Sequence, residues 1–131
     1  MADLKPTLTL TGTQADLGAT LSLSVDDTLS VVSPMQGVSK VTATTTGADS
    51  IILPSANACR YVYIKHTGLN AAGSTSGADK VEVETADGTA IMELKSGEFA
   101  FFPHFAQGTG LIQLEASANT VQVEYAYFTR A

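Results

Sequence analysis

The stretch "KVEVETADGTAIMELK" (80–95) decides the fold class of this chain. In "VEVE" (81–84), valine and glutamate alternate with the two-residue period of a strand that has one covered face. Asp87 and the glycine after it form a dipeptide typical of a tight hairpin turn. We therefore expect two paired strands here, with the valines in the core and Glu82 and Glu84 in solvent.

Similar short runs, separated by turn residues, occur along the rest of the chain, and no segment longer than a turn has a helical period. This pattern predicts an all-β fold, an antiparallel β-sandwich or jelly-roll-like domain. The further expected strands are "TLTLT" (7–11), "ATLSLSV" (19–25), "VSKVTATTT" (38–46), "SIIL" (50–53), "RYVYIKH" (60–66), "EFAFF" (98–102), "LIQLEA" (111–116) and "TVQVEYAYF" (120–128).

The composition changes near residue 60, because all nine aromatic residues lie after it and the first part is rich in Thr and Ser. "SPMQG" (33–37) interrupts the strand-forming runs as a cluster of breaker residues. We therefore divide the chain into an extended Thr/Ser-rich segment, 1–37, and a β-sandwich domain, 38–131. The segment 1–37 either serves as an assembly arm, with Leu8 and Leu10 as candidate interface residues, or completes the sheets of its own domain.

The stretch "GEFAFFPHF" contains four of the five phenylalanines. Phe99 and Phe101 alternate onto one face of a strand, and we expect both in the core. Pro103 cannot donate to a sheet ladder, so the strand ends there or lies at an edge. Phe102 then faces the other way and Phe105 follows in a loop, and we predict that these two contact another subunit or a partner.

The run "RYVYIKH" places Val62 and Ile64 on one face of its strand and Tyr61 and Tyr63 on the other. The side chains of Val62 and Ile64 are expected in the core. The two tyrosines are candidate interface residues, and they could also stack on sugar rings. A carbohydrate-binding β-sandwich module is therefore an alternative function.

Residues that could carry catalysis or hold a metal are not grouped in the sequence. His66 and His104 lie far apart and match no metal-binding spacing. Calcium loops, nucleophile elbows and glycine-rich phosphate loops are missing as well. Cys59 is the single cysteine, which excludes an internal disulfide and is expected to be a small buried residue. Glutamates in the strands, Glu93 among them, fit solvated faces. We expect no enzyme activity, no cofactor and no metal.

The net charge of −6 argues against nucleic acid as a partner. Binding to nucleic acid or to an anionic membrane needs clustered Lys and Arg, whereas the seven basic residues here are scattered. The N-terminal residues lack the basic and apolar regions of a signal peptide, and no run of 18 apolar residues occurs. We expect neither a nucleic-acid nor a membrane partner.

The second half of the chain, about residues 60–128, resembles small β-sandwich structural proteins of tailed bacteriophage virions. The resemblance is carried by "YVYIKHTG", "VEVETADGTAIMELKSGEFAFFP", "GLIQLEA" and "VQVEYAYF". It implies a virion building block, made in the host cytoplasm, and favours a capsid decoration protein that binds the phage major capsid protein in many copies. It also implies a homo-oligomer, with a trimer favoured at threefold lattice positions. A tail or fibre component is the alternative.

Overall fold

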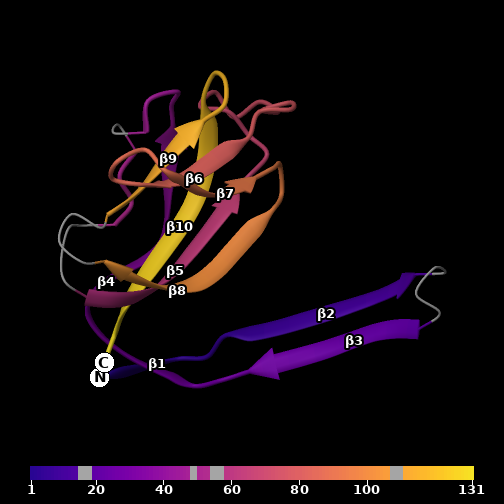
Figure 1. Ribbon diagram of the computed structural model, residues 1–131, viewed down its shortest axis with the longest axis vertical. Helices are drawn as coiled ribbons and strands as arrows, with labels where there is room; N and C mark the ends of the chain where they lie inside the picture. The colour runs from indigo at the N-terminus through magenta and orange to yellow at the C-terminus, as the bar shows by residue number, and fades with distance from the viewer. Residues whose placement is uncertain (15–18, 48–49, 54–57, 107–110) are drawn as a thin grey trace. The chain divides into compact units, whose positions relative to one another are not determined.

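The computed structural model describes residues 1–14, 19–47, 50–53, 58–106 and 111–131 (Figure 1). Every regular element in these ranges is a β-strand, and β1–β4, β10–β5, β2–β3, β5–β8, β6–β7 and β6–β9 pair antiparallel, which confirms the all-β expectation. The chain forms two compact units, Met1–Val32 with Arg130–Ala131, and Ser33–Thr129. The strands are β1 (Ala2–Leu4), β2 (Thr7–Gln14), β3 (Ala19–Asp26), β4 (Leu29–Ala43), β5 (Ala58–His66), β6 (Val81–Thr85), β7 (Ala90–Leu94), β8 (Phe99–Ala106), β9 (Ile112–Ala116) and β10 (Val121–Arg130).

The unit Ser33–Thr129 is a sandwich of two antiparallel sheets (Figure 1). One sheet has the order β4-β10-β5-β8, with β1 beside the first residues of β4, and the other has the order β7-β6-β9. Apolar side chains from both sheets meet between them, which is how each sheet buries one face. The core cluster contains Ala43, Ile52, Leu53, Val62, Ile64, Val81, Val83, Leu94, Ile112, Leu114, Ala116, Val121 and Val123.

The unit Met1–Val32 contains the hairpin β2–β3, whose strands pair from Thr7 opposite Asp26 to Gln14 opposite Ala19. The backbone N–H of Asp27 donates to the Pro6 carbonyl at 3.3 Å and closes the base of the hairpin. Opposite residues of an antiparallel pair point to the same face, so the register sorts the side chains by polarity. One face carries Leu8, Leu10, Leu21, Leu23 and Val25, and the other carries Thr7, Thr9, Thr11, Thr13, Thr20, Ser22, Ser24 and Asp26.

Two segments differ from the sequence expectation. The cluster 33–37 does not break a strand, because β4 runs through it and the Pro34 carbonyl accepts a bond from the Thr129 hydroxyl of β10 at 2.6 Å. Residues 50–53 form no strand and contribute one bridge, Ile51 opposite Gln113. This segment instead follows the free edge of β9, where Ser50 and Ile112 take part in backbone bonds of 3.1 and 3.0 Å.

The hairpin β6–β7 confirms the predicted turn, in which Gly88 has a φ of 79° and Thr85 N–H donates to the Thr89 carbonyl at 3.0 Å. The Asp87 carboxylate accepts bonds from the Thr85 hydroxyl and the Thr89 backbone N–H. These bonds, the Thr85 one foremost, lower the pKa of Asp87 below its usual value. Asp87 and Gly88, the two turn residues recognised in the sequence, therefore stabilise the turn between β6 and β7.

The predicted solvent position of Glu84 is wrong. The extra residue of the β6–β7 bulge is Ile91 on β7, whereas β6 pairs without a break along β9 and places Glu84 opposite Gln113, on the side away from the core valines. Glu84 is buried on that side because Gly47 lies against it, so close that an added Cβ would be 2.6 Å from its carboxylate oxygen. Its carboxylate accepts a bond from the Gln113 amide at 3.0 Å. Alternation predicts the face on which Glu84 lies, but not that the segment around Gly47 covers this face, which is why the sequence did not reveal the burial.

Candidate assembly surfaces

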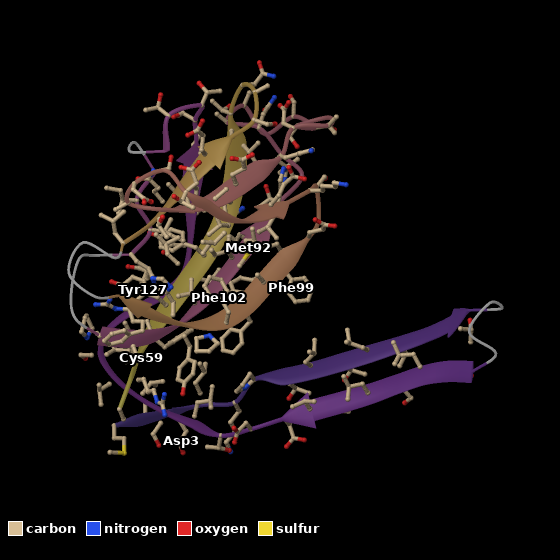
Figure 2. The ribbon with its side chains drawn as sticks, viewed as in Figure 1. Asp3, Cys59, Met92, Phe99, Phe102 and Tyr127 are labelled. Atoms are coloured by element: carbon tan, nitrogen blue, oxygen red, sulfur yellow. The ribbon has the colours of Figure 1, made fainter. Side chains whose placement is uncertain are left out.

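The predicted faces of the phenylalanines in β8 are reversed in the structure. Phe102 lies opposite Val62 in the β5–β8 ladder and packs against the core, whereas Phe99 and Phe101 are 58 % and 40 % exposed. Figure 2 shows Phe99 and Phe102 on β8 among the labelled side chains. The reason is the register, since residues opposite the buried Val62 must share its face. Alternation alone could not say which face of β8 the second sheet would cover.

The strand β8 also continues through Pro103 and includes Phe105, which was expected in a loop. Because β8 is the edge strand of its sheet, Pro103 can stay in it without the lost donor breaking a central ladder. The sequence predicted that Pro103 either ends its strand or lies in an edge strand, and the structure shows the edge strand. Phe105 is 62 % exposed and lies opposite Cys59. Cys59 is half-buried, which corrects its predicted burial.

The outer surface of β5 and β8 is lined with aromatic rings, and we call it the aromatic face. The Tyr61 and Phe101 rings stack with centroids 6.2 Å apart and planes at 17°, and Tyr63 lies opposite Phe101 in the ladder. Burial, and next the charge of Glu124, raise the pKa of Tyr63 above its usual value, so its phenol is neutral at physiological pH. The aromatic face consists of Tyr61, Tyr63, Phe99, Phe101 and Phe105.

A second apolar surface lies on the hairpin β2–β3, and we call it the aliphatic face. Its members are Leu8, Leu10, Leu21, Leu23 and Val25, which are 42–53 % exposed. The alternation in the sequence singles out only Leu8 and Leu10 as candidate interface residues. The three partners on β3 could be added only once the register was known, because one step of slippage would put Thr and Ser opposite the leucines.

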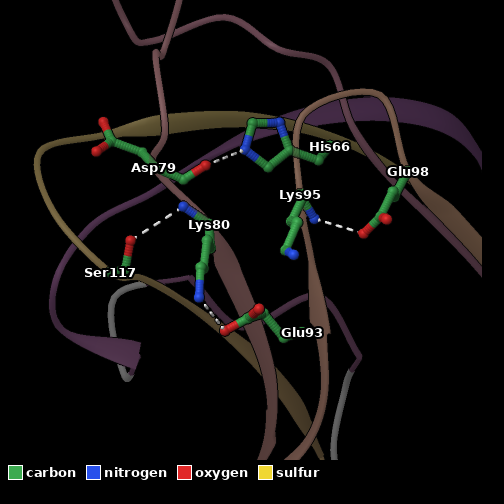
Figure 3. A network of polar contacts seen from close by, with 7 residues as sticks. All are labelled: His66, Asp79, Lys80, Glu93, Lys95, Glu98 and Ser117. Carbon is green, nitrogen blue, oxygen red and sulfur yellow. Dashed lines mark hydrogen bonds and ion pairs between the residues drawn. The ribbon is translucent and has the colours of Figure 1, made fainter.

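A polar network joins the loop after β5 to both sheets (Figure 3). His66 is fully buried, and its Nδ1 accepts the Gly68 N–H at 2.9 Å. The other ring nitrogen, Nε2, therefore carries the proton and donates to the Asp79 carbonyl at 3.0 Å. Three further contacts surround this one: Lys80 Nζ to Glu93 at 3.0 Å, Lys80 N–H to the Ser117 hydroxyl at 3.0 Å and Lys95 N–H to the Glu98 carboxylate at 2.8 Å.

These contacts hold the ends of the loops in place. Among the residues of the network, no nucleophilic side chain is hydrogen-bonded to a general base. From the sequence, His66 was a candidate only for metal ligation, and its structural role was not predicted. The role of Arg60 was not predicted either: this residue is buried, and its guanidinium lies 5.6 Å from the centre of the Tyr127 ring in a cation–π contact. The Arg60 contact joins residues far apart in the chain, and the His66 contacts depend on how the loop after β5 folds back, which no local pattern shows.

Within the ranges that the structure covers, no three or more His, Cys, Asp and Glu side chains gather where a metal ion could bind. The same ranges contain no helix of the length and apolarity needed to cross a membrane. Comparison of the chain with protein-family models gives no match, and comparison with curated proteins gives none either.

Proposed function

We propose that this chain is a non-enzymatic structural protein of a tailed-phage virion, a decoration protein that binds the head lattice in many copies. Its support from the sequence is the resemblance of about residues 60–128 to virion β-sandwich proteins. The observation that carries the proposal is the aliphatic face of the hairpin β2–β3, five exposed side chains on one side of a two-stranded ribbon.

A ribbon with an exposed apolar face is poorly stabilised in a protein that binds no partner. An isolated two-stranded hairpin is at best marginally stable in water, and contiguous exposed apolar groups mark interaction sites. The aromatic face adds a second apolar surface on β5 and β8. A building block that is finally surrounded by neighbours gains stability from burying both surfaces.

The proposed partners are further copies of the chain, with a trimer favoured, and the phage major capsid protein. A small all-β block suits a threefold position of a head lattice, because closed symmetry satisfies the same surface on every copy. A tail or fibre position is the alternative within the virion. Binding to purified tails and not to heads would favour that alternative.

Co-sedimentation tests the proposal directly. Heads assembled from the major capsid protein of the phage that encodes this chain are mixed with increasing amounts of the purified protein. We expect saturation at a fixed ratio to capsid subunits, and loss of binding when Leu10→Asp and Leu23→Asp make the aliphatic face charged. Thr9→Ala with Ser24→Ala, on the polar face of the same hairpin, is the matched control. Absence of any sedimenting protein at saturating concentrations would overturn the proposal.

A carbohydrate-binding module is the second candidate, and the stacked Tyr61 and Phe101 rings favour it. Exposed aromatic rings on a sheet can offer a flat platform to a sugar ring. Glycan-array binding that survives Cys59→Ala and is lost on Tyr61→Ala would support this module over the virion protein. We rank it second because the phenylalanines of the aromatic face bring no hydrogen-bonding groups to orient a sugar.

A further inference from the structure

We propose that His66 is a pH-sensitive switch: an additional proton on its ring turns over the peptide bond between Thr67 and Gly68 and opens the loop 67–80, while the two sheets stay folded. This loop joins β5 to β6 and lies within the unit Ser33–Thr129. The inference goes beyond the virion role proposed above and does not depend on it.

The His66 ring binds both ends of the loop. At the first end, the Gly68 N–H donates to Nδ1 at 2.9 Å. At the second end, Nε2 donates to the Asp79 carbonyl at 3.0 Å (Figure 3). The Ser76 N–H also joins the two ends, because it donates to the Gly68 carbonyl at 2.9 Å. Residues 71–75, between these contacts, are exposed, so the loop is anchored around one imidazole.

This arrangement requires a neutral ring. Nδ1 accepts the Gly68 N–H through its lone pair, whereas both nitrogens of a doubly protonated imidazole are donors. A proton on Nδ1 would face the Gly68 N–H, donor against donor, over a distance of 2.9 Å. The ring is also fully buried, so its positive charge would be held out of water. Protonation therefore removes one of the two bonds between the ring and the loop.

The acidic groups near the ring already have other partners. The Asp79 carboxylate accepts the Asn119 amide at 3.3 Å, the Glu98 carboxylate accepts a backbone N–H, and Glu93 forms an ion pair. The sheet neighbours Lys65 and Glu124 lie opposite each other and point to the other face of the sheet. Among the described residues, the charged groups on the elements around His66 are Lys65, Asp79, Lys80, Glu93, Lys95, Glu98 and Glu124.

Gly68 allows the first end of the loop to rearrange. Its φ is 81°. Turning over the peptide bond before it would point the Thr67 carbonyl at the protonated Nδ1 and make the φ of Gly68 negative, and glycine adopts both signs readily. The second end has space to move, because a hollow of about 280 Å³ lies beside Asp79. This hollow is lined by Gly77, Ala78, Asp79, Lys80, Lys95 and Ser96.

Hydrogen exchange followed by NMR tests the switch in the full chain. His104→Gln leaves His66 as the single histidine. The readout is the protection factor, the ratio of the intrinsic to the observed exchange rate at each pH. Between about pH 8 and pH 5, where histidine titrates and most carboxylates do not, protection of the Gly68 and Ser76 amides should fall by up to about tenfold per pH unit. Protection of the Val83 and Val123 amides should stay nearly constant, because the sheets remain folded.

His66→Gln in the same background is the matched control, because an amide side chain does not titrate. We expect the protection of its loop amides to be independent of pH over this range. An equal fall of loop protection in this control would overturn the proposal. Constant protection of Gly68 in His104→Gln would do so too. Loss of core protection in step with the loop would also overturn it, because that result describes unfolding of the whole domain by acid.

A measurement on the unmodified chain keeps the test valid if His66→Gln does not fold. The ¹⁵N chemical shifts of the His66 ring report its protonation, and the amide shift of Gly68 reports its hydrogen bond. We expect the proton on Nε2 at pH 8, and a change in both sets of shifts with the same midpoint. A ring that titrates without a change at Gly68, or that stays neutral down to pH 5, would contradict the switch. Neither result bears on head binding, so the two proposals can fail separately.

Discussion

The strands β2 and β5 have similar alternating sequences and opposite environments. In β5, Val62 and Ile64 are completely buried between two sheets. In β2, Leu8 and Leu10 alternate just as regularly and are each 43 % exposed. Alternation thus predicts that a strand has an apolar face, and it does not tell whether the chain supplies a second sheet to cover that face.

This difference implies different sources of stability for the two regions. Burial of apolar surface, at about 25 cal/mol per Å², stabilises the sandwich within one chain. The hairpin has its own backbone ladder, but among the described residues of its unit no second sheet covers its aliphatic face, so burial within the unit stabilises it less than it stabilises the sandwich. The following predictions test this contrast, from the largest expected effect to the smallest.

Deletion of residues 1–37 should abolish cooperative folding. It removes the hairpin together with residues 29–37 of the fifteen-residue strand β4, including the Pro34 carbonyl that accepts the Thr129 hydroxyl. The sheet would lose its pairing along that part of β10. Thermal unfolding followed by circular dichroism measures the effect.

The matched control removes the hairpin alone. Residues 7–26 are replaced by a short Gly-Asn-Gly turn, which the Pro6–Asp27 backbone bond makes feasible. We expect the melting temperature to stay within about 5 °C of wild type, corresponding to roughly 1 kcal/mol. A sharp transition in the 38–131 fragment, or a collapsed one after removal of the hairpin, would show that the regions do not differ in this way.

Phe102→Ala should reduce the free energy of unfolding by about 3 kcal/mol, because it removes a large side chain packed against the core. Phe99→Ala and Phe101→Ala should change the stability of the monomer by only about 0.5 kcal/mol, since both rings are exposed. Urea unfolding at a concentration where the chain is monomeric measures all three. Equal losses for Phe99→Ala and Phe102→Ala would contradict the observed faces of β8.

Gly47→Ala should cost about 1–3 kcal/mol through overpacking. A Cβ at this position would lie 2.6 Å from a Glu84 carboxylate oxygen and 2.7 Å from the Gln113 amide nitrogen, which are already bonded to each other in a buried site. Gly37→Ala is the matched control, because nothing lies within 4 Å of its added Cβ. Urea midpoints that fall equally for both substitutions would show that the effect is not specific to the buried pair.

Tyr63→Phe should make stability less sensitive to alkaline pH. The pKa of Tyr63 is raised in the folded chain, so above pH 10 the folded state holds this proton more tightly than the unfolded state. Stability is therefore lost as pH rises from the unfolded value through the folded one. Urea midpoints between pH 9 and 11 should fall less steeply in Tyr63→Phe, with Glu124→Gln between it and wild type. If the urea midpoints of Tyr63→Phe and wild type fall equally steeply with pH, Tyr63 does not contribute to the loss of stability at alkaline pH.

Much of the fold was predictable because its signals are local. Alternation identified β5, β6, β7 and β10, and the aspartate–glycine pair identified the turn between β6 and β7. The failures concern residues whose environment is set from a distance. Glu84 is buried because the segment around Gly47 lies against its face of β6, and Pro34 is accommodated within β4 by its neighbour β10.

For the candidate surfaces, too, the local features were predictable from the sequence and the features set by distant residues were not. By itself, the sequence determined that the chain is all-β, that Leu8 and Leu10 share a face, and that Tyr61 and Tyr63 oppose Val62 and Ile64, since side-chain direction in a strand has a fixed period of two. Only the tertiary structure decided that Phe102 faces the core while Phe99 and Phe101 face outward, and that five aliphatic residues of two strands form one surface. The physical reason is register: each strand's pattern is local, but the partner opposite each residue, and the sheet that covers it, are set by pairing between distant segments.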